Sequence, residues 1–194
     1  MSLTNSGEFK YIRIKLGWLR SNISINWGSA LYLIKSNAAF LIIAGLLNSF
    51  SADEQAYVQE FDAFFKDVFK AGASEIEVLD EIYSQQMSSG AYDEWYSFKN
   101  RFSNAMNEAA WFVVEKSKNP EAVKKAVKWS ESSLRIEKNN PYYLDTLAQL
   151  YYKNGEKQKA IATQEQALKF SETMDEQTIA ELKQVLQKMK IGTY

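Results

Sequence analysis

The residues of this chain that are best suited to chemistry are two pairs of adjacent carboxylates, Asp80 with Glu81 and Asp93 with Glu94. Two carboxyl groups can act as general acid and general base when their surroundings shift their pKa values apart. The chain contains no His and no Cys, which excludes the commonest general base, thiol nucleophiles, thiolate zinc sites and disulfides. Both pairs fall on the polar faces of expected helices, with no Gly-rich phosphate loop nearby. We therefore interpret them as solvated surface and predict no catalytic residue, no metal site and no cofactor.

The charge of the chain argues against nucleic acid as a partner. Its 194 residues include 23 Lys and Arg against 24 Asp and Glu, a formal net charge of −1. The small basic patch of Lys124, Lys125 and Lys128 falls short of what a phosphate backbone requires. Residues 1–50 carry five positive charges and one negative, whereas residues 51–100 carry three and eleven. The acidic stretch is either a solvated face or a surface that meets the basic segment of the same chain or of a second copy, so the sequence allows a homodimer.

The sequence offers no segment for membrane insertion. Its most apolar run, residues 38–47, would extend about 15 Å as a helix, half the thickness of the hydrocarbon core of a bilayer. We expect a buried helix there. The first twenty residues scatter their charges among apolar positions, so we expect no signal peptide. A chain without Cys gives no information on the redox environment, so the sequence allows both a cytoplasmic and a periplasmic location.

The elements that must position these residues are expected to be helices almost throughout. Apolar residues recur every three or four positions, and the chain contains only two Pro and eight Gly. Short polar signals mark the expected helix starts: Ser51 with Glu54, Ser74 with Glu77, Asn119-Pro120, Asn140-Pro141 and Thr173 with Glu176. Apolar residues between positions 8 and 28 also alternate in the manner of strands, so a hairpin is the alternative to helix in that segment.

A repeat of 34 residues organises the second half of the chain. Apolar and small residues recur at that interval: Ala126, Ser133 and Leu134 match Ala160, Ala167 and Leu168, and Ala110 and Val113 match Leu144 and Leu147. This length fits two short antiparallel helices with their turns, a unit that must stack on neighbours to bury its apolar face. In the better copy Ala148 and Ala160 would let the two helices approach closely, and Gly155 would supply a left-handed turn between them.

Residues 141–174 resemble a tetratricopeptide repeat (TPR), and residues 107–140 do so more weakly. Two positions depart from the family pattern, because Ala148 stands where Gly is usual and Gln164 where an aromatic residue is usual. The resemblance implies an all-α fold in which antiparallel helical hairpins form an α-solenoid, a right-handed superhelix. We expect about nine to eleven helices in all. They divide into an N-terminal helical region of degenerate hairpins, residues 1–104, and two TPR-like repeats with a capping helix, residues 105–194.

A narrower resemblance covers the same region. The runs 107–111, 126–129, 142–148 and 150–155 are similar to the helical C-terminal region of certain bacterial thioredoxin-like proteins. The redox half of that family carries a Cys pair, which this chain lacks. The resemblance implies a helical accessory domain of such a protein, with a task in recognition rather than in thiol exchange.

The TPR resemblance also implies which residues would bind a partner. In that family the first helix of each pair lines a concave groove, and its outward-facing residues hold a peptide or a partner segment. Mapped by spacing, these residues are Glu108, Trp111 and Glu115 in the weaker copy and Tyr142, Asp145, Gln149 and Tyr152 in the better copy. The aromatic residues would act as anchors, although they could pack against neighbouring helices instead. The sequence thus predicts a non-catalytic scaffold for protein binding.

Two alternatives from other classes stay open. The aromatic residues Phe40, Phe61, Phe64, Trp95 and Phe98 could enclose a pocket, as in a helical small-molecule binder or enzyme. The chain could also be a structural appendage that helps another domain dimerise or dock. A closed cavity among these aromatic side chains would favour the first alternative, and self-association through a broad apolar face would favour the second.

Overall fold

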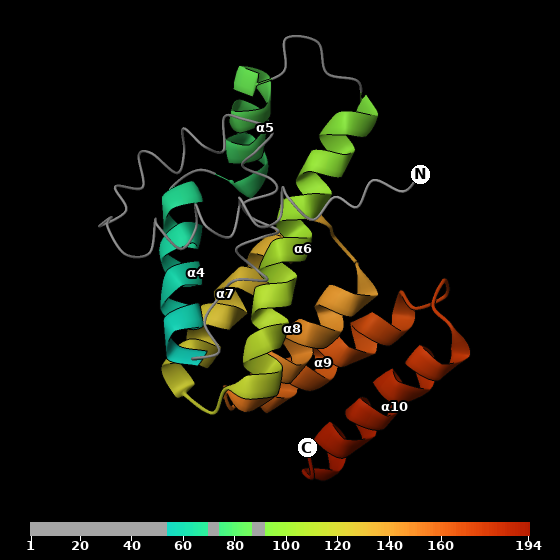
Figure 1. Cartoon of the computed structure of the whole chain (residues 1–194). Helices are drawn as coiled ribbons and strands as arrows, with labels where there is room; N and C mark the ends of the chain where they lie inside the picture. The colour runs from blue at the N-terminus through green and yellow to red at the C-terminus, as the bar shows by residue number, and fades with distance from the viewer. Residues whose placement is uncertain (1–53, 70–73, 87–91) are drawn as a thin grey trace, which may run out of the picture. The chain divides into compact units, whose positions relative to one another are not determined.

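The computed structural model describes residues 54–69, 74–86 and 92–194. Within these ranges every regular element is a helix, which confirms the predicted all-α class for this part of the chain. The helices are α4 (Glu54–Val68), α5 (Glu75–Gln86), α6 (Tyr92–Lys116), α7 (Pro120–Ile136), α8 (Pro141–Lys153), α9 (Lys157–Lys169) and α10 (Glu176–Ile191) (Figure 1). The expectations for residues 8–28, for the apolar run 38–47 and for the cap at Ser51 lie outside the described residues.

Three of the predicted helix starts are confirmed at the level of single hydrogen bonds. Asn119 accepts from the backbone N–H of Glu121 at 3.0 Å, and Asn140 accepts from that of Tyr142 at 3.1 Å. In both cases Pro occupies the first helical position, where a missing N–H costs nothing. Ser74 and Glu77 form the predicted capping box, in which the Ser74 N–H donates to the Glu77 carboxylate at 2.9 Å and the Glu77 N–H donates to the Ser74 hydroxyl at 3.3 Å.

The predicted cap of the last helix is wrong. The residue that caps α10 is Asp175, whose carboxylate accepts from the Thr178 N–H at 2.9 Å. Thr173 lies instead within a turn closed by a hydrogen bond from the Met174 N–H to the Ser171 carbonyl at 2.9 Å. This turn moves the start of the helix beyond Thr173, where a charged carboxylate takes over as acceptor.

Helix α6 continues without a break through Ser103 and Asn104, past the boundary expected between residues 104 and 105. The Ser103 side chain is buried and bonds the Asn100 carbonyl at 3.0 Å, one turn back in the same helix. Its hydroxyl also lies 3.3 Å from that of Tyr143 on α8. Asn104 contacts the same Tyr143 hydroxyl through its side-chain oxygen. Both polar side chains therefore bind across to α8, and the proposed boundary between residues 104 and 105 falls inside one continuous helix.

Helices α6 to α10 form a series of neighbouring pairs. Helix α6 packs against α7, α8 against α9, and α10 against α9, while α8 also contacts α6 and α7. Three residues join α6 to α7 and three join α8 to α9, so each pair runs antiparallel (Figure 1). Residues one repeat apart share the same burial: Ala110 with Leu144, Val113 with Leu147, Ala126 with Ala160, and Ser133 with Ala167. The period seen in the sequence is thus reflected in which positions are buried.

The small residues predicted at the interface between α8 and α9 are found there. Ala148 and Ala160 are fully buried and belong to one apolar cluster with Met189 of α10. Between the two helices Gly155 adopts a left-handed conformation with φ of +84°, which glycine accepts without the steric cost of a side chain. A second cluster joins Leu144, Ala167 and Leu182 from the same three helices.

Aromatic side chains attach α4 to α6 and α7. The rings of Tyr57 and Phe112 have centroids 4.1 Å apart, and Phe61 meets Trp129 edge-on at 4.7 Å. Trp129 is fully buried, and its indole N–H has no hydrogen-bond partner among the residues that the structure describes. Phe61 and Phe64 are likewise buried, with ring centroids 5.8 Å apart. These rings fill the space between the helices by packing on one another.

Candidate functional site

The predicted partner-binding residues of the weaker repeat form an open stripe on α6. Glu108, Trp111 and Glu115 are three and four positions apart, so they share one face of the helix. All three are exposed to solvent, and Trp111 retains 37% of its accessible surface. An indole with this exposure offers both an apolar ring and a polar N–H to a partner. We call Glu108, Trp111 and Glu115 the α6 stripe.

The corresponding stripe on α8 is open at one end and covered at the other. A shift of 34 residues takes Glu108 to Tyr142 and Glu115 to Gln149. Tyr142 is 53% exposed, whereas Gln149 is only 6% exposed. Asp145 and Tyr152, on the same face, are partly buried. Gln149 thus lies on the predicted face of α8, but the expectation that it is exposed there is wrong.

The cover over α8 is a chain of polar contacts from three other parts of the fold. The Tyr194 hydroxyl donates to the side-chain carbonyl of Gln149. The Gln149 amide nitrogen donates to Asp145 Oδ2 at 2.7 Å, and the Gln164 amide of α9 donates to Asp145 Oδ1 at the same distance. Gln164 also donates to the Leu182 carbonyl of α10 at 3.3 Å. The departure from the TPR pattern at Gln164 thus corresponds to a fully buried amide that links α8 to its neighbours.

Aromatic contacts complete this arrangement. We call Asp145, Gln149 and Tyr152 the α8 site, which Tyr194 covers. The rings of Tyr152 and Tyr194 meet edge-on with centroids 5.1 Å apart. The Lys157 ammonium lies 5.5 Å from the centre of the Tyr152 ring, a cation–π distance. The α8 site therefore combines a hydrogen-bond acceptor for a hydroxyl group, the Gln149 side-chain carbonyl, with the aromatic ring of Tyr152.

At the α8 site the pKa values of Asp145 and of the covering Tyr194 are both raised. Burial raises the pKa of Asp145 above its ordinary value; the amide donors of Gln164 and Gln149 oppose this effect, and the nearby Glu181 adds to it. Burial also raises the pKa of Tyr194, and the charge of Asp145 acts in the same direction. Tyr194 is consequently a neutral hydroxyl donor at physiological pH.

Lys153 fixes α8 relative to α6. Its ammonium, at the end of α8, donates to the backbone carbonyls of Val114 and Ser117, the second at 3.0 Å. Val114 lies in the last turn of α6 and Ser117 directly follows the helix, and a cation stabilises this end of a helix. Burial lowers the pKa of Lys153. Together with the contacts of Tyr143 at the other end of α8, this bond holds the two predicted binding faces in register.

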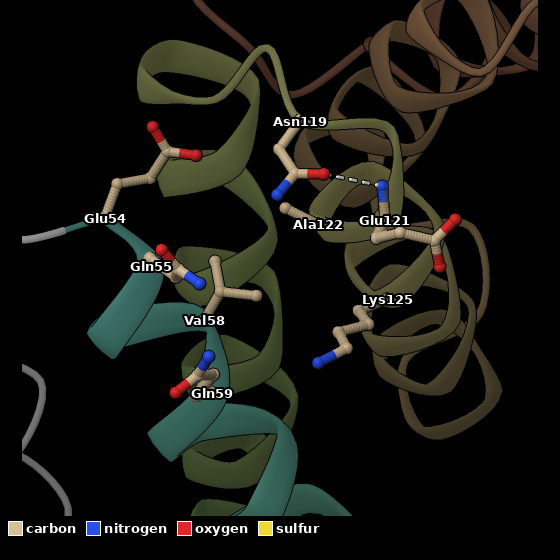
Figure 2. Close-up of a pocket in the computed structure, with 8 residues that line it drawn as sticks. All are labelled: Glu54, Gln55, Val58, Gln59, Asn119, Glu121, Ala122 and Lys125. Carbon is tan, nitrogen blue, oxygen red and sulfur yellow. Dashed lines mark hydrogen bonds between the residues drawn. The ribbon is translucent and has the colours of Figure 1, made fainter.

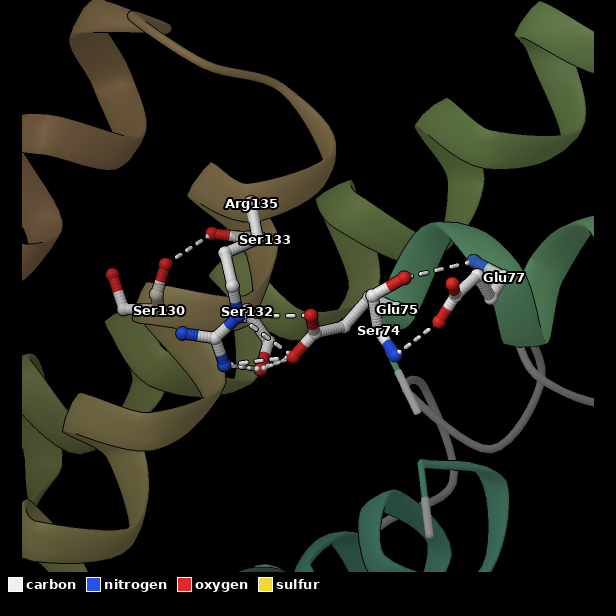
Figure 3. Close-up of polar contacts among 7 residues, drawn as sticks. All are labelled: Ser74, Glu75, Glu77, Ser130, Ser132, Ser133 and Arg135. Atoms are coloured by element: carbon white, nitrogen blue, oxygen red, sulfur yellow. Dashed lines mark hydrogen bonds and ion pairs between the residues drawn. The ribbon is translucent and has the colours of Figure 1, made fainter. Parts of the chain in front are cut away.

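An ion pair between the buried Glu75 and the exposed Arg135 anchors α5 to α7 (Figure 3). Glu75, at the start of α5, accepts from Arg135 Nε at 2.8 Å and from the Ser132 hydroxyl at 2.7 Å. Burial by itself would raise the pKa of Glu75, but the hydrogen bonds from Arg135 and Ser132 outweigh it, and the net pKa is lowered. Sequence reasoning missed this pair because its members lie 60 residues apart and carry no local signal.

A cavity of about 180 Å³ lies between α4 and the start of α7 (Figure 2). Its lining is polar apart from Val58 and Ala122, and it includes Glu54, Gln59 and Lys125. None of its described lining residues is aromatic, so it is not the aromatic pocket considered from the sequence. Of the residues named for that pocket, Phe40 and the side chain of Trp95 lie outside the described residues.

Of the two acidic pairs singled out in the sequence, the structure describes the side chains of one. Asp80 and Glu81 are exposed on α5, and the side chains of Asp93 and Glu94 lie outside the described residues. Among the residues that the structure describes, no group of three or more acidic, His or Cys side chains is placed to hold a metal ion. In the same residues, no helix combines the length and apolarity needed to cross a membrane.

No protein-family model, curated protein sequence or solved structure matches this chain. The resemblances to TPR proteins and to bacterial thioredoxin-like proteins therefore stay predictions. The function of the chain has to be inferred from its own residues and their contacts.

Proposed function

We propose that residues 105–194 form two TPR-like repeats with a capping helix and act as a non-catalytic module that binds a peptide or partner segment. The observation that carries this proposal is the agreement between the 34-residue period and burial. Four pairs of residues one repeat apart are buried in equivalent positions of the α6–α7 and α8–α9 pairs. A repeat stack of this kind leaves one face of each first helix available for recognition.

The first helices of the two pairs contribute a continuous surface. Helices α6 and α8 contact each other directly, and Lys153 holds their ends in register. Trp111 and Tyr142 are exposed aromatic residues on these two helices, and such side chains supply most of the energy in many protein interfaces. Glu108 and Glu115 stand on either side of Trp111 in the α6 stripe. Their charge suits a partner segment in which positive residues flank an apolar side chain.

Selection of short random peptides on the immobilised chain tests this proposal. We expect the selected peptides to lose at least about tenfold in affinity on Trp111→Ala, because truncation of a central aromatic anchor costs more than about 1 kcal/mol. Tyr142→Ala should weaken the same peptides. The matched control is Gln166→Ala, an exposed residue of α9, which should leave binding unchanged. Peptides that bind all variants equally, with circular dichroism showing unchanged helix content, would contradict the proposal.

A further inference from the structure

The end of α10 turns the chain back toward α8. Gly192 follows the helix in a left-handed conformation with φ of +77°. The Thr193 N–H donates to the Lys188 carbonyl at 3.0 Å, and the Gly192 N–H donates to that of Met189 at 3.3 Å. These bonds form the usual glycine stop of a helix, which reverses the chain direction. As a result, Tyr194 lies against the face of α8 that carries the predicted partner-binding residues.

The α8 site has the chemistry of a receptor for a tyrosine side chain. The amide nitrogen of Gln149 is bound to Asp145, which Gln164 holds from the other side. This arrangement fixes the orientation of Gln149, so its carbonyl oxygen is presented as an acceptor to a hydroxyl donor. Tyr152 supplies an edge-on contact to an aromatic ring. A phenol satisfies both requirements, whereas an aliphatic alcohol lacks the ring and a phenylalanine lacks the donor.

The described contacts that attach the Tyr194 side chain to α8 are a hydrogen bond to Gln149 and a ring contact to Tyr152. Tyr194 remains 36% exposed, and the neighbouring Ile191 is 60% exposed. A residue attached in this way can leave the site without unfolding of α8, which is buried against three other helices.

We propose that the α8 site is a tyrosine-binding subsite of the partner groove, filled within the chain by Tyr194, and that a tyrosine in an extended partner segment replaces it. This inference rests on the proposed function, because it names the side chain that the groove accepts. The stripe on α6 is open, and the α8 site is closed by the chain itself. A partner must therefore compete with Tyr194, and its apparent affinity is reduced by the fraction of molecules in which the site is closed.

The test uses the full chain and a peptide that the structure itself defines. The probe is a synthetic peptide with the sequence of residues 189–194, amidated at its end and labelled with a fluorophore. We expect it to bind the Tyr194→Ala chain at least about tenfold more tightly than wild type. A tenfold difference corresponds to a wild-type site that Tyr194 occupies in about nine of ten molecules. Equal affinity for the two chains, or no binding to Tyr194→Ala by NMR titration up to about 1 mM, would overturn the inference.

Three matched changes identify the site. In the Tyr194→Ala chain, Gln149→Ala should weaken the peptide about three- to tenfold, the worth of one hydrogen bond. A peptide with Phe in place of its Tyr should lose a similar factor. Gln166→Ala should change nothing. If Gln149→Ala lowers the helix content, Tyr152→Leu serves as the second variant and should also weaken the peptide. Binding that is indifferent to Gln149, Tyr152 and the phenol hydroxyl would refute the site.

The outcomes separate this inference from the proposed function. If library peptides need Trp111 but bind wild type and Tyr194→Ala equally, the groove stands and the tyrosine subsite fails. If the tyrosine peptide binds at Gln149 but no selected peptide needs Trp111, the subsite stands and the proposed groove fails. Analytical ultracentrifugation adds one control: a wild-type dimer that Tyr194→Ala converts to monomer would place Tyr194 in a second copy and overturn filling within the chain.

Discussion

Gln164 shows how a single polar residue can determine local packing. It is fully buried at a position where the TPR pattern has an aromatic ring, and its amide nitrogen bonds Asp145 and the Leu182 carbonyl. Its side-chain oxygen has no hydrogen-bond partner within the described part of the chain. A buried amide of this kind is costly unless its donors are used, and here they satisfy a partly buried carboxylate. The residue therefore connects α8, α9 and α10 through polar contacts instead of ring packing.

Replacement of this amide tests the connection. Gln164→Leu should lower the free energy of unfolding by about 1–3 kcal/mol, because Asp145 then loses a donor within the protein. The matched control on the same helix is Gln166→Leu, at an exposed position, which should stay within about 0.5 kcal/mol of wild type. Urea unfolding followed by circular dichroism measures both. Equal stability of the two variants would mean that the amide is unimportant.

Glu75 makes the stability of the chain depend on pH in a defined direction. Its pKa in the folded chain is lower than the ordinary value of 4.5. Its contribution is therefore complete above that value and is lost as the pH falls through the lowered folded pKa. Glu75→Gln should cost about 1–3 kcal/mol at pH 7, and the difference from wild type should shrink below pH 4.5. Urea unfolding between about pH 7 and pH 3 checks this, and a difference that grows toward acid would refute it.

At the scale of the element, the helix pairs depend on local signals and on small side chains. The caps at Asn119 and Asn140 and the box of Ser74 with Glu77 fix where three helices begin. Ala148 and Ala160 fix how closely α8 and α9 approach. The caps act over three or four residues of the chain, whereas the alanine contacts require that two helices pack against each other.

The close approach of α8 and α9 predicts a position-specific response to added volume. Ala160→Leu should lower the free energy of unfolding by about 1–3 kcal/mol, because the extra atoms enter a filled interface. Ala162→Leu, two residues along the same helix at an exposed position, should stay within about 0.5 kcal/mol of wild type. Thermal and urea unfolding of the two variants give the comparison. If Ala160→Leu leaves the free energy of unfolding unchanged, the interface is not tightly packed at this position.

At the scale of the whole molecule, the described helices differ in how many neighbours support them. Helix α8 packs against α6, α7 and α9, whereas the main contact of α10 is with α9. Stacked helical pairs are stabilised chiefly by adjacent elements, so an element with neighbours on one side opens more easily. The two helices should therefore differ in local stability even though both are well formed.

Hydrogen exchange followed by NMR or mass spectrometry measures this difference. Backbone amides in the middle of α8 should exchange more slowly than those in the middle of α10, by tenfold for each 1.4 kcal/mol or so of opening free energy. Leu182→Ala should widen the difference, since Leu182 is a buried residue of α10 that clusters with Ala167 of α9. Identical exchange of α8 and α10 would show that they open as a single unit.

The sequence predicts what depends on neighbours along the chain and fails where distant parts meet. The caps at Asn119 and Asn140, the turn at Gly155 and the burial of Ala148 follow from spacing alone. The polar contacts of Glu75 with Arg135 and of Gln149 with Tyr194 join residues 60 and 45 positions apart, and no local pattern reports them. Spacing predicts an exposed Gln149 because it defines the helix face but not the side chain that covers it. Gly192 is a local signal of the chain reversal near Tyr194.

The continuity of α6 bears on how this protein can be dissected. A fragment that began at residue 105 would cut the helix in its middle, and it would lose Ser103 and Asn104, which hold the Tyr143 hydroxyl. The new end would expose backbone N–H groups that the intact helix satisfies. Recombinant pieces intended for crystallisation should therefore retain α6 from Tyr92 onward.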